Sequence, residues 1–168
     1  RLGIGGHFEP GIAELHAGIQ LPDLFQRFVA HRARAVCGTV NSVVVQNVKV
    51  TNTRASNVVV RGTSRNVAII HSDFSRASSS LVSLSLNHTT ETLTPSGVVV
   101  QNCIFHDTYP TYQGAIAYSG YRMVVSHNYF QNTNCSGGNS AECIIEYNVF
   151  EGGSKDVTDG GMIYTWGW

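Results

Sequence analysis

The chain has 168 residues, and its 11 Lys and Arg balance its 11 Asp and Glu, so the formal net charge is zero. This length suits a single domain with a real core, and the low charge content of 13% disfavours an electrostatic nucleic-acid-binding protein. No apolar run approaches the ~20 residues of a membrane-spanning helix.

The first 40 residues match no repeat, and we expect them to form an N-terminal cap or lead-in segment. Within them, the stretch 21–36 (LPDLFQRFVAHRARAV) has two interpretations. It is either an amphipathic helix with Pro22 and Asp23 near its start, or a set of irregular strands that precede the first full coil.

Five related segments follow, each with alternating apolar residues, three mostly polar positions, and a closing Val or Phe. They are VVVQNVKV (43–50), VAIIHSDF (67–74), VVVQNCIF (98–105), MVVSHNYF (123–130) and CIIEYNVF (143–150). The closing residues are separated by 24, 31, 25 and 20 positions. A period of this length predicts a solenoid, and β-branched residues at i and i+2 indicate strands. We therefore predict an all-β parallel β-helix of about five coils over residues 41–168.

The alternation also predicts which side chains fill the interior. We expect the first and third residues of each segment to point inward. They are joined by a stack of the closing residues Val50, Phe74, Phe105, Phe130 and Phe150. A turn column should hold Val48, Ser72, Cys103, Asn128 and Asn148, and its stacked Asn side chains can hydrogen-bond along the axis.

A second family of strands is predicted after each loop, at 57–62, 81–86, 114–120 and 161–167. The fourth coil lacks such a strand in this interpretation and has only a Gly/Ser loop between Cys135 and Cys143. The strand at 161–167 leaves an open hydrogen-bonding edge. We therefore expect the chain to be a fragment of a longer solenoid, or this edge to be covered by a partner chain.

Cysteines and glycosylation sequons point to an extracellular protein. Cys135 and Cys143 bracket CSGGNSAEC, a flexible loop that a disulfide would close; the alternative is that the cysteines are free, buried thiols. Two Asn-X-Ser/Thr sequons begin at Asn87 and Asn134. Together these features favour a secreted glycoprotein.

One outward column combines polar and aromatic residues, namely Asn47, His71, Asn102, His127 and Tyr147. Adjacent coils lie ~4.8 Å apart, so the column forms a ladder of donors and acceptors near the spacing of sugar rings. This arrangement suits a polysaccharide. The alternative is that these are solvated turn residues.

The loops before the second strands supply the carboxylates. Aligning Gly114 with Gly161 puts Tyr112 in line with Asp159, which is the best-positioned carboxylate unless it only caps its own turn. Asp107, Glu146 and Asp156 are other carboxylates that stacking can bring near. Two carboxylates about 5 Å apart suit retaining glycoside hydrolysis, and about 6.5–9.5 Å suits inversion.

The coil segments, followed by DGGMIYTWG (159–167), resemble the right-handed parallel β-helix superfamily of secreted carbohydrate-active proteins, which includes pectate lyases and glycosidases. The resemblance covers roughly 41–168, and Met162 stands where the family usually has Ala. The resemblance implies an activity on glycans but does not specify which reaction. Lyase members use a Lys or Arg base, often with calcium. In this sequence, the basic residues near the second strands are only Arg61, Arg122 and Lys155, and no dense acidic cluster that could bind calcium is visible. These departures favour a hydrolase that uses carboxylates over a lyase.

We therefore predict a secreted polysaccharide-active enzyme of the glycoside hydrolase type. Its candidate catalytic residues are Asp159, Asp107, Glu146 and His127. Its candidate substrate-binding residues are Tyr164, Tyr118, Tyr112, His106, Asn102 and Trp166. No metal or cofactor is expected, although a lyase could use calcium. The alternatives are a non-catalytic glycan-binding or assembly module and a uronate polysaccharide lyase.

Overall fold

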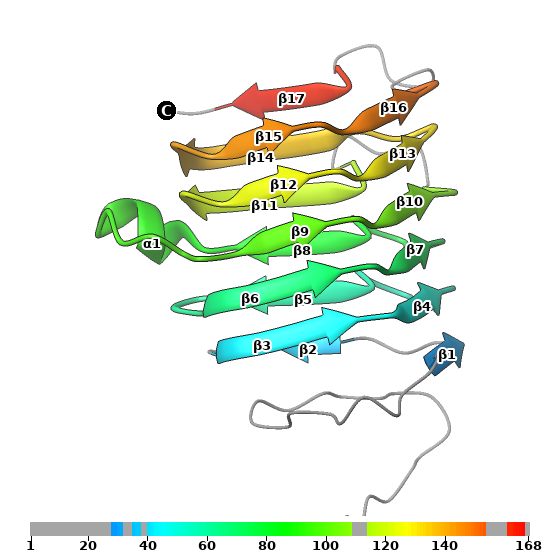
Figure 1. The fold of residues 1–168 in the computed structure, drawn as a ribbon, viewed down its shortest axis with the longest axis horizontal. Helices are drawn as coiled ribbons and strands as arrows, with labels where there is room; N and C mark the ends of the chain where they lie inside the picture. Colours follow the sequence, from blue (N-terminus) through cyan, green and yellow to red (C-terminus); the bar gives the residue numbers. More distant parts are fainter. Residues whose placement is uncertain (1–27, 32–34, 38–39, 109–113, 154–160, 167–168) are drawn as a thin grey trace, which may run out of the picture.

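The structure is a computed structural model that describes residues 28–31, 35–37, 40–108, 114–153 and 161–166. Short parallel strands stack into three sheets (Figure 1). Sheet A consists of β1 (Phe28–His31), β4 (Val48–Thr51), β7 (Asp73–Ser75), β10 (Ile104–His106), β13 (Tyr129–Gln131) and β16 (Val149–Glu151). Sheet B consists of β2 (Ala35–Cys37), β5 (Val58–Arg61), β8 (Val82–Ser85), β11 (Ile116–Tyr121), β14 (Cys135–Ala141) and β17 (Ile163–Trp166). Sheet C consists of β3 (Asn41–Gln46), β6 (Arg65–Ile70), β9 (Val99–Gln101), β12 (Val124–Ser126) and β15 (Ile144–Glu146).

The chain visits the sheets in the order C, A, B in five successive coils, from β3–β4–β5 to β15–β16–β17. This confirms the parallel β-helix of about five coils. Strands β1 and β2 lie before residue 40 and pair with β4 and β5, so they belong to the same sheets as the coils that follow. Between 21 and 36, the described stretches are strands and not a helix. No helix in the described part of the chain is long and apolar enough to span a membrane.

Three columns of left-handed residues bend each coil. In the coils from β3 to β16, such residues recur five positions apart, with φ between 49° and 66°. The B–C corner column is Ser42, Asn66, Gly97, Arg122 and Glu142; the C–A corner column is Asn47, His71, Asn102, His127 and Tyr147; the A–loop corner column is Asn52, Arg76, Asp107, Asn132 and Gly152. Asn, Asp, His and Gly tolerate this conformation best, which explains why they are frequent in the columns.

The predicted interior is confirmed. Phe74, Phe105, Phe130 and Phe150 form one stack, with successive ring centroids 5.6, 5.0 and 4.6 Å apart. The inward residues of sheet C also join the core: Val45, Ile69, Val100 and Val125 are buried, and Ile145 packs against them. In-register pairing of identical residue types therefore holds the coils in a single alignment.

The predicted second strands are confirmed as β5, β8, β11 and β17, and the register agrees with the alignment of Gly114 and Gly161. The prediction for the fourth coil was wrong. The Gly/Ser-rich stretch is strand β14, which pairs with β11 on one side and β17 on the other. Gly and Ser have weak strand propensity, so β14 is imposed by its two neighbours.

The predicted disulfide is not formed, because Cys135 and Cys143 are both free. Strand β14 holds its ends about 20 Å apart at ~3.3 Å per residue, and Cys143 lies just beyond its far end. A disulfide needs Cα atoms within about 7 Å. Cys135 instead points into the core, where burial raises the pKa of its thiol.

Candidate functional site

A cleft of about 580 Å³ opens beside the A–loop corner column. It is lined by Asn52, Thr53, Arg54, Arg76, Ser78, Asp107 and Thr108, which come from three consecutive coils. The loops stay in parallel register past the corner, because Thr53 pairs with Ala77 and the backbone N–H of Arg76 donates to the carbonyl of Asp107 at 3.2 Å. The Ser78 hydroxyl donates to the carbonyl of Arg54, which ties adjacent loops together.

A chain of acidic, basic and histidine side chains runs across the outer face of sheet A into this cleft. The ammonium of Lys49 lies 2.7 Å from Oδ2 of Asp73, and Oδ1 of Asp73 lies 2.9 Å from Nε2 of His106. The other ring nitrogen of His106, Nδ1, lies 3.1 Å from Oδ2 of Asp107. The same Asp107 oxygen is 3.5 Å from Nε of Arg76. Asp107 and Arg76 are therefore the last two members of a five-residue network, and both line the cleft.

His106 contacts a carboxylate with each ring nitrogen. A protonated imidazole donates from both nitrogens, whereas a neutral one donates from only one. Since the ring lies between Asp73 and Asp107, no sugar fits between these two carboxylates. The Asp107 side chain, 49% exposed, is the more accessible of the two; that of Asp73 is 27% exposed. Asp107 is thus the carboxylate that a ligand in the cleft would meet.

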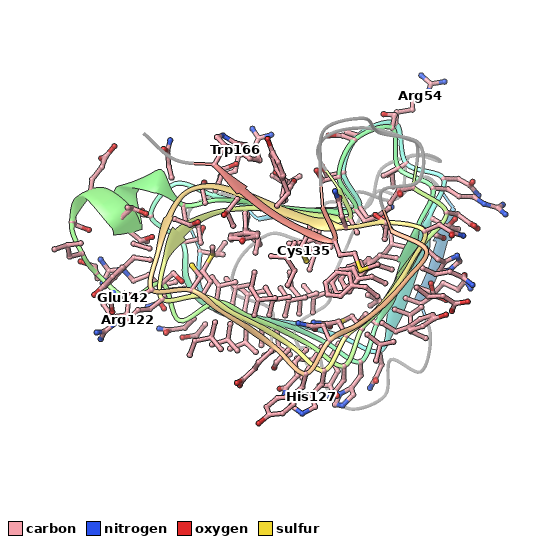
Figure 2. All side chains as sticks on the ribbon, turned by 90° about the horizontal axis from the view of Figure 1, so that it is seen from above. Arg54, Arg122, His127, Cys135, Glu142 and Trp166 are labelled. Carbon is pink, nitrogen blue, oxygen red and sulfur yellow. The ribbon has the colours of Figure 1, made fainter. Side chains whose placement is uncertain are left out.

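The structure does not bring the other predicted catalytic residues to the cleft. His127 lies in the C–A corner column, and its ring stacks on Tyr147 with centroids 5.0 Å apart. Figure 2 shows His127 at a corner far from Arg54. The five positions from Asn102 to Asp107 span roughly 16 Å of extended chain, so Asn102 also lies away from the cleft.

Glu146 ends β15 in sheet C and is exposed. Glu146 pairs in register with Ser126, which pairs with Gln101 in the coil that carries Asp107. Within that coil, strand β10 lies between Gln101 and Asp107. The structure therefore does not pair Asp107 with Glu146. Asp156, Asp159 and Tyr112 lie outside the described residues. Within the described residues, no group of three His, Cys, Asp or Glu side chains fits a metal ion.

The predicted role of Tyr118 in substrate binding was wrong. Its side chain belongs to the core, and burial raises its pKa to about 12. The ring lies over Gly137 of the next strand, where an added Cβ would come within 2.2 Å of it. Tyr164 and Trp166 have the opposite orientation and lie on the outer face of sheet B, where Trp166 is 48% exposed.

The predicted glycosylation at Asn134 is contradicted by burial. Asn134 is 4% exposed and Ser136 of the same sequon is fully buried, so the folded chain has no room for a glycan there. The close approach of Gly114, whose added Cβ would lie 2.0 Å from Oδ1 of Asn134, shows how tightly this amide is packed. Asn87 begins α1 (Asn87–Glu91), and Thr89 of its sequon is buried with its hydroxyl donating to the carbonyl of Leu86.

Sequence reasoning missed Lys49, Asp73, Arg54 and Arg76. A signal for three of these was present. Lys49 and Asp73 each come one residue before a stacked core residue and pair in register. Arg76 and Asp107 likewise each follow a stacked Phe by two positions. Opposite charges at equivalent repeat positions therefore indicated the ion pairs, whereas the arrangement of the loops around Arg54 had no such signal.

Comparison of this chain with models of known protein families, with curated proteins and with solved structures found no match. The structure shows the parallel β-helix, and membership of the carbohydrate-active superfamily remains a prediction from the coil motifs.

Proposed function

We propose that this protein is a secreted polysaccharide-active enzyme whose reaction takes place in the cleft, with Asp107 as its acid/base residue. The observation that carries the proposal is the placement of Asp107. Of the described residues that line the cleft, it alone has a carboxylate, and one of its oxygens is held by both His106 and Arg76. The other oxygen remains available to a ligand.

The remaining lining residues suit a hydroxyl-rich substrate. Asn52, Thr53, Ser78 and Thr108 offer amide and hydroxyl groups that donate and accept hydrogen bonds. The loops that carry them are tied to one another by backbone hydrogen bonds, so these groups would meet a substrate in an ordered arrangement. In ligand sites, precisely placed polar groups fix the orientation of the ligand and provide specificity.

In a hydrolase, Asp107 would protonate the glycosidic oxygen, and His106 would orient the carboxyl group through Nδ1. Hydrolysis needs a second carboxylate on the other side of the sugar. Asp73 is unsuitable because the His106 ring separates it from Asp107. The predicted Asp159 is our candidate for that role.

A uronate lyase is the second candidate, favoured by the two guanidinium groups that line the cleft. Arg76 pairs with Asp107, whereas the described residues include no carboxylate within ion-pairing distance of Arg54. An unpaired arginine at the cleft suits a substrate carboxylate. Arg54 would then neutralise the uronate while a base removes the proton beside it.

The test measures cleavage of a panel of neutral and acidic polysaccharides by the unmodified protein and by Asp107→Asn. We expect the variant to lose roughly 100-fold or more of the activity, the usual contribution of an acid/base residue. Glu142→Gln is the matched control, because Glu142 is also a left-handed corner residue and pairs with Arg122 at 2.7 Å. Its activity should match that of the unmodified protein.

The products separate the two reactions, since hydrolysis releases only reducing ends and a lyase also forms an unsaturated sugar that absorbs in the near ultraviolet. Undiminished activity in Asp107→Asn would remove Asp107 from the mechanism. If the unmodified protein cleaves none of the polysaccharides, the enzyme proposal fails and a non-catalytic glycan-binding module replaces it.

A further inference from the structure

Two aromatic side chains lie side by side on the outer face of sheet B. Tyr164 and Trp166 are two residues apart in β17, so both point to the same face, and their ring centroids are 5.9 Å apart at an angle of 43°. Figure 2 shows Trp166 on the outside of the solenoid, between α1 and the loop that carries Arg54. This aromatic pair is separate from the residues that line the cleft.

The indole of Trp166 rests on a glycine of the neighbouring strand. Gly138 pairs with Trp166 in register, and a Cβ added to Gly138 would lie 2.6 Å from both Cε2 and Nε1 of the ring. The nearest atoms to that Cβ position all belong to Trp166. One side of the ring is thus seated on the backbone of β14, while Trp166 as a whole remains 48% exposed. The result is a supported aromatic surface that faces solvent.

Small polar residues continue this face along the solenoid axis. On the side of β14 away from Trp166, the register between β11 and β14 shifts between Tyr118 and Gly120, so Ser119 continues the column without an in-register partner in β14. Beyond this irregularity, Ser119 is aligned with Ser85, and Ser85 with Arg61. Ser85 and Arg61 are exposed, and Ser119 donates to the carbonyl of Leu84 at 3.3 Å, which leaves its oxygen free to accept. At ~4.8 Å per coil, the column from Trp166 to Arg61 extends roughly 19 Å.

We propose that this face is a second glycan-binding site, at which one pyranose ring stacks on the exposed side of Trp166 and the polysaccharide continues along the column toward Arg61. The aromatic face is electron-rich, and it attracts the C–H groups on the flat side of a sugar ring. The hydroxyls of the neighbouring sugars then meet Ser119 and Ser85, and Arg61 donates to sugar oxygens. The site goes beyond the proposed function, because it needs no reaction in the cleft.

A glycan fits this face better than a protein partner does. Beyond the aromatic pair, the column offers hydroxyl, glycine and guanidinium groups, whereas the core of a protein interface is usually apolar and densely packed. The column also repeats at the spacing of the coils, which suits a linear polymer with a regular repeat. The contribution of Trp166 is therefore to hold one sugar ring and to fix where the bound polysaccharide begins on the column.

Affinity electrophoresis in gels that contain soluble polysaccharide tests this proposal, with hydroxyethyl cellulose, galactomannan, soluble starch and polygalacturonate as probes. All proteins carry Asp107→Asn, so that binding is measured without cleavage. We expect retardation by at least one polysaccharide, and roughly tenfold weaker binding after Trp166→Ala, the size expected for loss of an aromatic contact.

Gly138→Ala is a second, milder variant. Its Cβ would displace the indole from its seat, because the three atoms nearest to that Cβ all belong to Trp166, so binding should also weaken while the fold is retained. Tyr147→Ala is the matched control, because Tyr147 is an exposed aromatic residue (73%) at the C–A corner and should have no effect.

Absence of retardation in every gel, or equal losses in Trp166→Ala and Tyr147→Ala, would overturn the proposal. So would a change in oligomeric state in Trp166→Ala with undiminished glycan binding, since the face would then be a protein contact. Retardation that depends on Trp166 supports this site whether or not the unmodified protein cleaves any polysaccharide, so the two proposals fail separately.

Discussion

Asn128 shows how single residues hold the turn between sheets C and A. Its Oδ1 accepts from the backbone N–H of Cys103 at 2.9 Å, and its Nδ2 donates to the carbonyl of Val100 at 2.9 Å. Its own N–H and Nδ2 both donate to Oδ1 of Asn148 in the next coil. A single buried amide therefore connects three consecutive coils, as the stacked turn column predicted.

We predict that Asn128→Ala lowers the free energy of unfolding by about 2–4 kcal/mol, because the buried N–H of Cys103 and the carbonyl of Val100 lose their partner. Urea unfolding followed by circular dichroism measures the change. Asn132→Gly is the control, since Asn132 is exposed and glycine also adopts its φ of 53°. A change below about 1 kcal/mol in Asn128→Ala would contradict the hydrogen-bond account.

At the scale of elements, the strands are short, between three and seven residues, and stability must come from stacking between coils. The phenylalanine stack is the clearest example of such stacking between coils, since Phe105 lies between Phe74 and Phe130 with no exposed surface. Each coil buries its apolar face only against its neighbours. A defect in one coil therefore weakens the contacts on both sides.

Phe105→Ala should lower the free energy of unfolding by about 3–5 kcal/mol, through the lost apolar burial and the cavity left in the stack. Ile104→Ala in the same strand is the comparison, because Ile104 is 46% exposed and its truncation leaves no cavity. Equilibrium urea denaturation of both variants provides the measurement. Equal losses in the two would mean that the stack is not the main source of stability in β10.

The whole molecule has an interior that opposes ionisation. Burial raises the pKa of Cys103 to about 11 and that of Tyr118 to about 12. In the unfolded chain these groups lose their protons near 9.0 and 10.0, whereas the folded chain retains them to higher pH. The contribution of these two protonated groups to the free energy of unfolding is therefore complete below pH 9. It is lost as the pH rises through their pKa values in the folded chain.

We predict that the urea midpoint falls steadily as the pH is raised from 8.5 to 11, and that Tyr118→Phe makes this fall shallower above pH 10. A phenylalanine has no proton to lose, so it removes one contribution to the alkaline sensitivity. Tyr147→Phe, at an exposed position, should leave the slope unchanged. Identical slopes for all three proteins would show that Tyr118 ionises as freely in the folded state as in the unfolded chain.

Much of the fold could be predicted from the sequence, because the strongest signals are local. Alternating β-branched residues determine strands and their inward faces, and the recurring Phe determines the register between coils. The C–A corner column was also predicted as an outward, polar turn. It is left-handed in every coil, which accounts for its Asn and His without any ligand.

Other features depend on neighbours distant in the sequence, and only the tertiary structure decided them. Strand β14 has the residues of a flexible loop and is extended because β11 and β17 pair with it. The cleft depends on how loops of unequal length meet, which repeat spacing does not specify. By itself, the sequence determined a β-helix with a phenylalanine core, since local alternation and repetition suffice for that. The structure decided that Asp107, and not Glu146 or His127, contacts His106 and Arg76 beside the cleft, because the contact with Arg76 requires two consecutive coils to be stacked.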